Sequence, residues 1–267
     1  MFDLAADFKD ESEALYGLLE PLSEDDLFRP TRFKDWSPND VVGHLHLWNV
    51  AADLSYTDEA GFEALMADLL PKIIGGQSHV EVTTEWLDGL KGRELLEAWR
   101  NFYLPMSEHF AKADPKARVK WAGPDMSVRS SITARLMETW SHGQAVYDLL
   151  GVKRVNTDRI KNIAVLGVNT FGWTFKNRKL ELPGEPPYVK LGAPSGAVWE
   201  WNEPNGENFV EGSAEEFCQV VTQSRALGDT SLQVVGDPAT QWMTIAQCFA
   251  GQPETPPEAG WRKRETG

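Results

Sequence analysis

The segment METWSHGQAVYDLLG, from Met137 to Gly151, places a glutamate and a histidine four residues apart within a strong helical pattern. Residues at positions i and i+4 project from the same face of a helix. Glu138 and His142 can therefore both reach one ion, whereas a solvated helix more often pairs glutamate with lysine. The pair becomes a metal site only if another part of the chain supplies a third ligand.

The third ligand is expected from the segment GHLHLW, which contains His44 and His46. Two residues correspond to about 200° of helical rotation, so these two histidines face opposite sides. His44 belongs to an apolar stripe whose other members are Val41, Leu45, Trp48 and Ala52. His46 falls on the opposite side with Asn39 and Asp53. His44 is therefore the inward candidate, and His46 is expected to stay outside the site.

Two histidines and one carboxylate, with an open fourth position, are the ligand set of a catalytic zinc site. A structural zinc site would close the shell with a fourth protein ligand. Imidazole also suits nickel, copper and iron, so the ligand types do not select the metal. The spacing by itself leaves a second interpretation open, in which Glu138 and His142 form a hydrogen-bonded pair and His44 is a satisfied core histidine.

Four amphipathic helices are predicted to position these residues, because apolar residues recur at helical spacing along the first half of the chain. The expected helices span Leu4–Leu22, Asp40–Tyr56, Arg93–Ala111 and Ser130–Leu150. Such a set, joined by one or two longer crossovers, indicates a four-helix bundle. The segment between Phe62 and Thr84 is expected to be a crossover with some helix of its own.

Local signals mark the ends of these helices. Ser37 is the expected N-cap of the second helix, with Pro38 at its first position and Asp40 in its first turn. Pro105 predicts a kink or a break in the third helix. Gly151 is expected to close the fourth helix in the usual C-terminal position.

The composition changes after about residue 180, where ELPGEPPYVKLGAPSG indicates a linker that enters a strand and a turn. Two strand-to-helix units follow. In the first, Ser213 and Glu216 form an expected capping box; in the second, Asp237 is the expected cap and Pro238 the helix start. The overall expectation is an α+β fold with four segments. These are a metal-binding helical bundle (1–155), a connecting helix and linker (156–183), a small α+β domain (184–255) and a polar tail (256–267).

Composition excludes several classes of protein. The chain has 267 residues and a net charge of −14, which argues against nucleic acid or an anionic membrane as a partner. No basic, apolar targeting segment and no membrane-length apolar run are present. The only two cysteines, Cys218 and Cys248, are expected to be small buried residues in a protein of the reducing cytoplasm. The expected partner is a small-molecule substrate, with monomer and homodimer both open.

The segments DWSPNDVVGHLHLWNVAADL and RLMETWSHGQAVYDLLGV resemble the two signature helices of the mycothiol-dependent maleylpyruvate isomerase family, part of the wider DinB-like group of metal-binding four-helix bundles. The stretch from VWEWNEPNGENF to MTIAQCFAG is similar to the C-terminal domain of a two-domain subgroup, some of whose members carry the label wyosine base formation. This resemblance implies a divalent metal, usually zinc, held by His44, Glu138 and His142.

The resemblance also implies a chemistry. The metal would hold the sulfur of a low-molecular-weight thiol, mycothiol or glutathione, as a thiolate that adds to an electrophilic carbon. The expected enzyme is then a thiol-dependent isomerase or S-transferase. Two alternatives stay open: a metal-dependent hydrolase that needs no thiol, and a non-catalytic binding protein. In the last, a cleft in the C-terminal domain would be lined by Trp199, Trp201 and Trp242, although packing is the favoured role of these tryptophans.

Three further residues receive expectations. Arg135 lies three residues before Glu138 and is a candidate for holding a substrate carboxylate, with a surface arginine as the favoured alternative. His79 and His109 have no partner in any motif and are expected to be surface residues.

Overall fold

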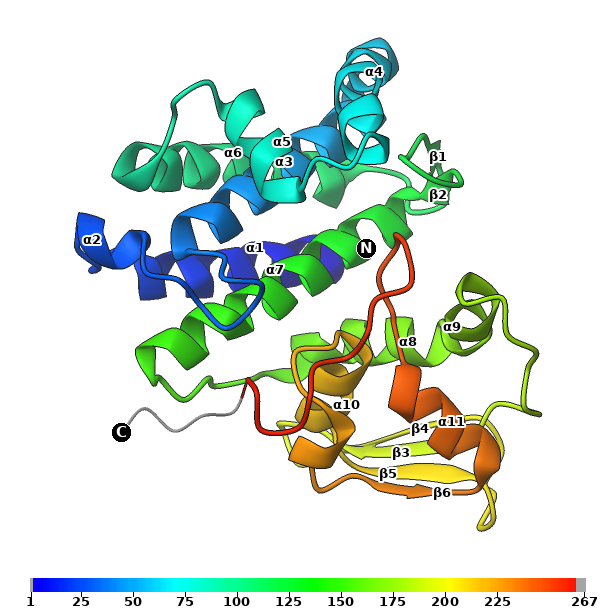
Figure 1. Ribbon diagram of the computed structural model, residues 1–267. Coiled ribbons are helices and arrows are strands. Elements are labelled where there is room, and N and C mark those ends of the chain that lie inside the picture. Colours follow the sequence, from blue (N-terminus) through cyan, green and yellow to red (C-terminus); the bar gives the residue numbers. More distant parts are fainter. Residues whose placement is uncertain (1, 263–267) are drawn as a thin grey trace. The chain divides into compact units, whose positions relative to one another are not determined.

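The protein is described by a computed structural model of residues 2–262. The chain forms two compact units, Met1–Leu149 and Leu150–Gly267. The first consists mainly of helices, and the second combines helices with a four-stranded sheet (Figure 1). The predicted α+β fold with an N-terminal helical bundle is confirmed.

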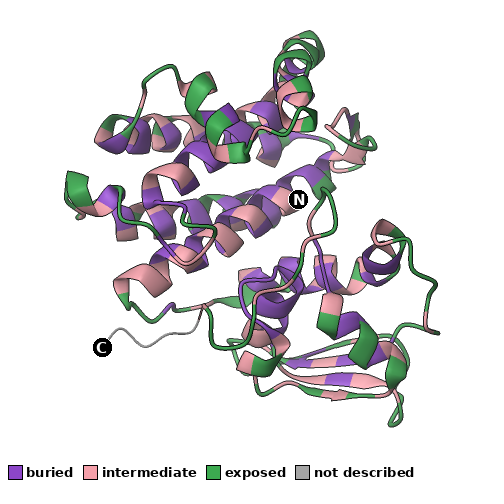
Figure 2. Ribbon diagram, in the orientation of Figure 1, coloured by how far each residue is buried: buried purple, intermediate pink, exposed green. Residues whose placement is uncertain are grey.

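The N-terminal unit is built on four long helices. These are α1 (Phe2–Leu19), α3 (Pro38–Thr57), α6 (Gly92–Lys112) and α7 (Val128–Leu150). Shorter elements connect them: α2 (Glu24–Leu27), α4 (Glu59–Ile74), α5 (His79–Leu87) and the hairpin strands β1 (Arg118–Val119) and β2 (Met126–Ser127). α6 packs against both α1 and α3. Buried residues of the long helices lie mainly on the sides that face their neighbours (Figure 2).

α3 is the central helix of this unit, because every residue from Val41 to Asn49 is buried. Its start follows the predicted signals: Ser37 is the N-cap, Pro38 lies in the first turn, and Asp40 completes a capping box. The Asp40 N–H donates to Ser37 Oγ at 3.2 Å, and the Ser37 N–H donates to Asp40 Oδ2 at 2.8 Å. Four orphan donors begin every helix, so this reciprocal pair fixes where α3 starts.

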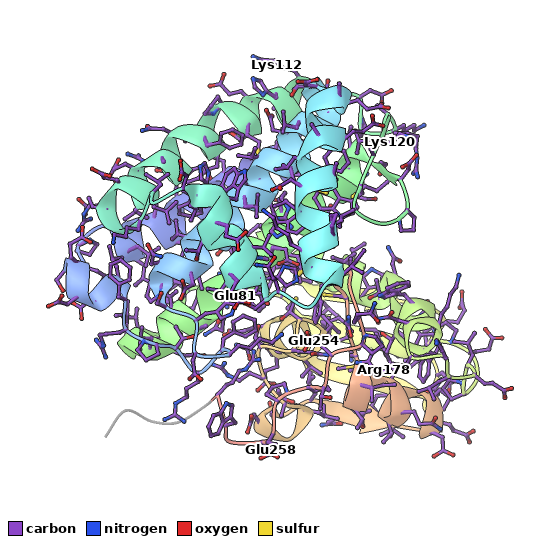
Figure 3. The ribbon with its side chains drawn as sticks, turned by 45° about the horizontal axis from the view of Figure 1, so that its top comes forward. Glu81, Lys112, Lys120, Arg178, Glu254 and Glu258 are labelled. Carbon is purple, nitrogen blue, oxygen red and sulfur yellow. The ribbon has the colours of Figure 1, made fainter. Side chains whose placement is uncertain are left out.

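α5 covers one side of α3 at a position where a glycine leaves little room to spare. A Cβ atom on Gly43 would lie 3.0 Å from Leu87 Cδ1 and 3.2 Å from Thr83 Cγ2, both on α5. α5 itself begins with a capping box between Ser78 and the exposed Glu81, which is labelled in Figure 3. The absence of a side chain at Gly43 therefore allows α5 to approach α3 directly beside His44.

Two further expectations for the first half concern the segment after α3 and the proline of α6. The segment expected as a crossover with some helix contains most of two helices, α4 and α5. Pro105 was expected to kink or break the third helix; it does not break it, because α6 continues through it from Gly92 to Lys112. Pro105 and Asn101, whose carbonyl loses its helical donor, are both exposed, so water can satisfy the free carbonyl.

The C-terminal unit contains a mixed sheet with helices packed against it. Its helices are α8 (Lys161–Asn169), α9 (Phe171–Asn177), α10 (Ala214–Val221) and α11 (Asp237–Ile245). Its strands are β3 (Tyr188–Gly192), β4 (Val198–Trp201), β5 (Phe209–Ser213) and β6 (Gln233–Val235), in the order β4-β3-β5-β6. β3 and β5 are parallel, and each pairs with an antiparallel edge strand. α10 packs against α8 and against the two central strands.

Two of the three tryptophans considered for a cleft, and both cysteines, are buried in this unit, whereas Trp201 is half-buried. Trp242 is 1% exposed, and its ring lies 5.4 Å from Phe171 and 5.8 Å from Phe217. Trp199 is also buried. Cys218 and Cys248 are buried, as expected, and form no disulfide; burial raises the pKa of Cys218 well above its usual range. These residues fill the interior of the unit, which supports the packing role over a binding cleft.

Both expected helix caps of the C-terminal unit differ from the structure. Ser213 occupies the N-cap position of α10 but makes no side-chain cap hydrogen bond. Glu216 instead accepts hydrogen bonds from the Ser231 N–H at 3.1 Å and the Ser231 hydroxyl at 2.8 Å. α11 is preceded by Gly236 at the N-cap, and Asp237 is its first residue. In α10, the tertiary contact of Glu216 with Ser231 replaces the expected capping box. In α11, the helix starts one residue earlier than expected, at Asp237.

None of the helices in residues 2–262 combines the length and the apolar character needed to cross a membrane.

Candidate metal centre

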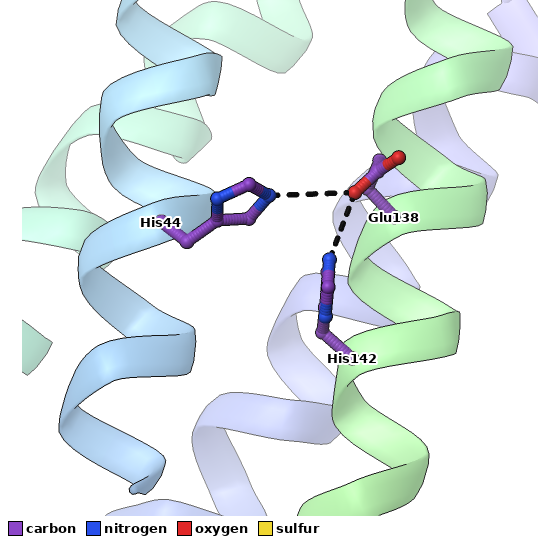
Figure 4. A group of neighbouring side chains, drawn as sticks. All are labelled: His44, Glu138 and His142. Atoms are coloured by element: carbon purple, nitrogen blue, oxygen red, sulfur yellow. Dashed lines mark hydrogen bonds and ion pairs between the residues drawn. The ribbon is translucent and has the colours of Figure 1, made fainter. Parts of the chain in front are cut away.

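Three side chains expected to act together do meet in the N-terminal unit. His44 projects from α3 toward Glu138 and His142 on α7 (Figure 4). Glu138 Oε2 lies 3.4 Å from His44 Nε2 and 2.9 Å from His142 Nε2. One ligand atom from each residue lies within 4.8 Å of the other two. The i, i+4 spacing on α7 and the inward face of α3 therefore direct the three groups to one point.

The cluster is largely shielded from solvent. The side chains of His44, Glu138 and His142 are 10%, 19% and 12% exposed, respectively. Burial lowers the pKa of His44 to about 3, against the opposing effect of Glu138. Burial by itself raises the pKa of Glu138, but hydrogen bonds from His142 and His44 outweigh it and hold that pKa well below its usual range. A neutral His44 beside an ionised carboxylate is a protonation state suited to binding a cation.

Aromatic rings set the orientation of the two imidazoles. Trp36 stacks on His142, with ring centroids 5.4 Å apart and an interplanar angle of 13°, and its ring lies 5.1 Å from that of His44. Phe33 meets the His142 ring edge-on at 5.0 Å. The Nδ1 atoms of both histidines are buried without a hydrogen-bond partner among residues 2–262. Zinc-binding histidines usually donate this second N–H to an acceptor; here packing takes over the role of orientation.

These residues fit a divalent cation. Two imidazole nitrogens and one carboxylate oxygen form a donor set used for zinc and for several transition metals. All three donor atoms face each other rather than the solvent, and the two Nε2 atoms are the ones directed at Glu138. The assignment of His44, Glu138 and His142 as metal ligands remains a prediction, and this geometry supports it.

His79 was missed as a neighbour of the cluster. It is exposed, as expected, but its ring lies 5.8 Å from that of His44 and 6.3 Å from that of Trp48. The sequence signal that marks its position is the capping box of Ser78 and Glu81, which starts α5 at His79. No local pattern shows that α5 lies against α3. His109 is exposed and pairs with Asp53 at 2.9 Å, away from any cluster.

His46 lies outside the cluster, in an aromatic environment. Its ring lies 5.5 Å from Trp86 and 5.5 Å from Phe102, both in edge-on geometry. Burial lowers the pKa of His46 to about 4. These contacts agree with the expectation that His44 faces the cluster and His46 lies outside it.

The favoured expectation for Arg135, a surface arginine, is wrong, because the side chain is buried. It is 4% exposed, and its Nε and Nη1 atoms are buried without a hydrogen-bond partner among the described residues. Its guanidinium carbon lies 5.9 Å from the centroid of the Trp121 ring. Burial lowers the pKa of Arg135, and the nearby Glu138 opposes this effect.

A helical bundle with a two-histidine, one-carboxylate cluster defines a class of candidate metal-binding proteins. The family model for the mycothiol maleylpyruvate isomerase N-terminal domain matches residues 8–147, which include the whole cluster. The chain belongs to this family, as the resemblance predicted. It is 40% identical over 248 residues to two proteins of Mycobacterium tuberculosis, the uncharacterized proteins MT0041 and Rv0036c. Each alignment covers 93% of this chain and 95% of the relative.

Two solved structures also resemble the chain. They are the crystal structures of the mycothiol-dependent maleylpyruvate isomerase and of a histidine mutant of that enzyme. Their sequence identities are 14% and 13%, each with a TM-score of 0.49, covering 82% of this chain and 87% of theirs.

Proposed function

We propose that this protein is a divalent-metal-dependent enzyme that uses a low-molecular-weight thiol to convert a small electrophilic substrate, as an isomerase or an S-transferase. The observation that carries this proposal is the convergence of three metal-ligating atoms from His44, Glu138 and His142. Membership in the mycothiol maleylpyruvate isomerase family supports the use of a thiol as cosubstrate. We propose zinc as the metal and mycothiol or glutathione as the cosubstrate.

The chain's own residues would do two things at this site. The Nε2 atoms of His44 and His142 and Oε2 of Glu138 would hold the cation, leaving a position for a further ligand. Trp36 and Phe33 pack against the imidazoles and keep water away from that side. When bound, a divalent cation supplies the positive charge that stabilises a thiolate near neutral pH. The reaction class is addition of the thiol sulfur to an electrophilic carbon, followed by elimination in an isomerase.

The test is metal content by elemental analysis, combined with calorimetry of mycothiol and glutathione. The variants are His44→Ala and the control His109→Ala, which removes an exposed histidine of the same unit. We expect about one divalent metal per chain in wild type and control, and almost none in His44→Ala. Thiol binding is expected only in the metal-loaded proteins.

Two results would contradict the proposal in different ways. Metal without thiol binding would favour a hydrolase or a non-catalytic binding protein. Absence of metal from the wild type, even after reconstitution, would mean that Glu138 and His142 form only a hydrogen-bonded pair.

A further inference from the structure

A tight turn from Phe33 to Trp36, just before α3, lies against the candidate metal centre. The Trp36 N–H donates to the Phe33 carbonyl at 2.9 Å, and the Thr31 N–H donates to the Trp36 carbonyl at 2.8 Å. The Phe33 N–H donates to Thr31 Oγ1 at 3.1 Å. The backbone of both aromatic residues is therefore anchored to Thr31, which is 3% exposed.

The two central residues of this turn adopt a backbone conformation that side-chain-bearing residues rarely take. Lys34 has a φ of 51° and Asp35 a φ of 58°, and two successive positive φ values are typical of a type I′ turn. Such turns favour glycine and asparagine, because in other residues the Cβ atom crowds the following carbonyl oxygen. Lys34 and Asp35 are exposed, so burial of their side chains does not impose the conformation. Strained backbone of this kind persists where the surrounding structure over-determines it, often beside functional sites.

The turn places two aromatic rings against the metal-ligating imidazoles. Phe33 and Trp36, at its first and last positions, have ring centroids 5.1 Å apart. The Trp36 ring stacks on His142 at 5.4 Å and lies 5.1 Å from the ring of His44. The two imidazoles are themselves 4.7 Å apart. Trp36 is thus almost equally close to both imidazoles and restrains the two together.

Hydrogen bonds among residues 2–262 do not provide this restraint, because Nδ1 of His44 and Nδ1 of His142 are buried without a partner there. In most metal sites an acceptor at this nitrogen fixes the imidazole, and its removal weakens metal binding by about 10- to 100-fold. Here the flat face of Trp36 lies parallel to His142 to within 13°. Rotation of the His142 ring about χ2 would drive its edge into the indole, so stacking limits that rotation.

The same aromatic surface limits how many ligands an ion can take. Three protein donors leave one position open on a tetrahedral ion and three on an octahedral one. The side chains of the cluster are at most 19% exposed, and Trp36 is 9% exposed. Additional water ligands on the side of Trp36 and Phe33 would meet rings that offer no hydrogen-bond acceptor in their plane. An apolar wall next to a metal site controls its access to solvent.

We propose that the turn Phe33–Trp36 is a positioning element of the metal centre, in which Trp36 orients the imidazoles of His142 and His44 and makes the site selective for tetrahedral over octahedral divalent ions. This inference rests on the metal-binding part of the proposed function. It adds the residues that determine the class of ion. Trp36 is a positioning residue, because it contacts the ligating rings and acts through them.

The probes are zinc and nickel alone, since nickel disfavours tetrahedral coordination, and competition with a chromophoric chelator measures their affinities. Trp36→Leu keeps an apolar side chain without a flat ring, and Trp36→Phe keeps a ring. The control Trp86→Leu removes the ring packed on His46, outside the cluster. We expect Trp36→Leu to bind zinc about 10- to 100-fold more weakly, with a smaller loss for nickel. Trp36→Phe should retain most of the zinc affinity, and Trp86→Leu should keep the zinc-to-nickel ratio of wild type.

Cobalt(II) reports the coordination geometry, because its visible absorption is intense in tetrahedral sites and weak in octahedral ones. We expect intense absorption in wild type, Trp36→Phe and Trp86→Leu, and weak absorption in Trp36→Leu. Thermal midpoints of the metal-free proteins are measured in parallel. A merely structural role of Trp36 would lower the midpoint and weaken both ions alike, with no change in the cobalt spectrum.

A second pair of variants tests the turn with both rings left in place. Proline fixes φ at about −65° and cannot adopt the conformation of Lys34. Glycine adopts it readily. Lys34→Pro should therefore lower the zinc-to-nickel ratio about as much as Trp36→Leu, and Lys34→Gly should keep the ratio of wild type.

The outcomes separate this inference from the proposed function. The same zinc-to-nickel ratio and cobalt spectrum in wild type, Trp36→Leu and Lys34→Pro would overturn the positioning role while metal and thiol binding stand. Equal changes in Trp36→Leu and Trp86→Leu would also overturn it, because any lost ring would then have the same effect. Metal binding that depends on Trp36 in a protein that binds neither mycothiol nor glutathione would support the positioning role and overturn the thiol-dependent function. A wild type that takes up no ion would overturn both.

Discussion

The two sides of α3 carry the same residue type at the same burial, yet only one side forms a candidate site. His44 and His46 are both 8% exposed. His44 faces a carboxylate and a second imidazole on α7, whereas His46 faces the aromatic rings of Trp86 and Phe102. Burial lowers the pKa of both histidines. Burial therefore keeps an imidazole neutral, and the groups across from it decide whether it can share a cation.

The largest expected effect is on zinc affinity, and it comes from removing the negative charge of Glu138, which faces His44. Glu138→Gln keeps the shape of the side chain but loses the carboxylate, so zinc affinity should fall by more than about 100-fold, the upper range of losses seen when only a partner of a ligand is removed. His46→Gln is the matched change on the other side of α3 and should leave zinc affinity unchanged. Competition with a chromophoric chelator measures both. Equal affinities of the two variants would show that the two sides of α3 do not differ in this way.

The next effect concerns the pH dependence of stability in the metal-free protein. The pKa of His46 is about 4 in the folded chain and about 6.5 in an unfolded one, so the unfolded state binds the proton first as pH falls. The contribution of neutral His46 is fully present above pH 6.5 and is lost as pH falls toward 4. His46→Phe should remove up to about 3 kcal/mol from the difference in unfolding free energy between pH 7 and pH 4.

Urea unfolding at both pH values measures this difference. His44 remains in the variant and still contributes, so the pH dependence should shrink and not disappear. An unchanged difference would mean that His46 takes up its proton without unfolding, and that its aromatic environment admits water.

The smallest effect tests how the start of α3 is held. Ser37→Ala removes the capping hydrogen bond to Asp40 and should lower the free energy of unfolding by about 1 kcal/mol. Ser213→Ala is the control, because Ser213 occupies the same position of α10 without a side-chain cap bond and should change stability by less than about 0.5 kcal/mol. Denaturant midpoints at constant m-value measure both changes. Similar losses in the two variants would show that the capping box does not stabilise α3.

Local signals were reliable where neighbouring residues determine the structure. The Ser37 and Asp40 capping box, the glycine with positive φ at Gly151 and the common face of Glu138 and His142 all depend on residues within one or two helical turns. The expected cap at Ser213 failed because its partner Glu216 found Ser231, fifteen residues further along the chain. A local rule holds only while no distant group offers a better hydrogen bond.

The sequence by itself therefore determined the four long helices, the common face of Glu138 and His142 on α7 and the side of α3 that carries His44. Helical periodicity settles these points, because it needs no knowledge of what lies opposite. Only the tertiary structure decided that α5 brings His79 beside His44 and that Arg135 is buried next to Trp121. Those contacts join residues far apart in the chain, and burial of a long charged side chain depends on which elements pack around it, which no local pattern records.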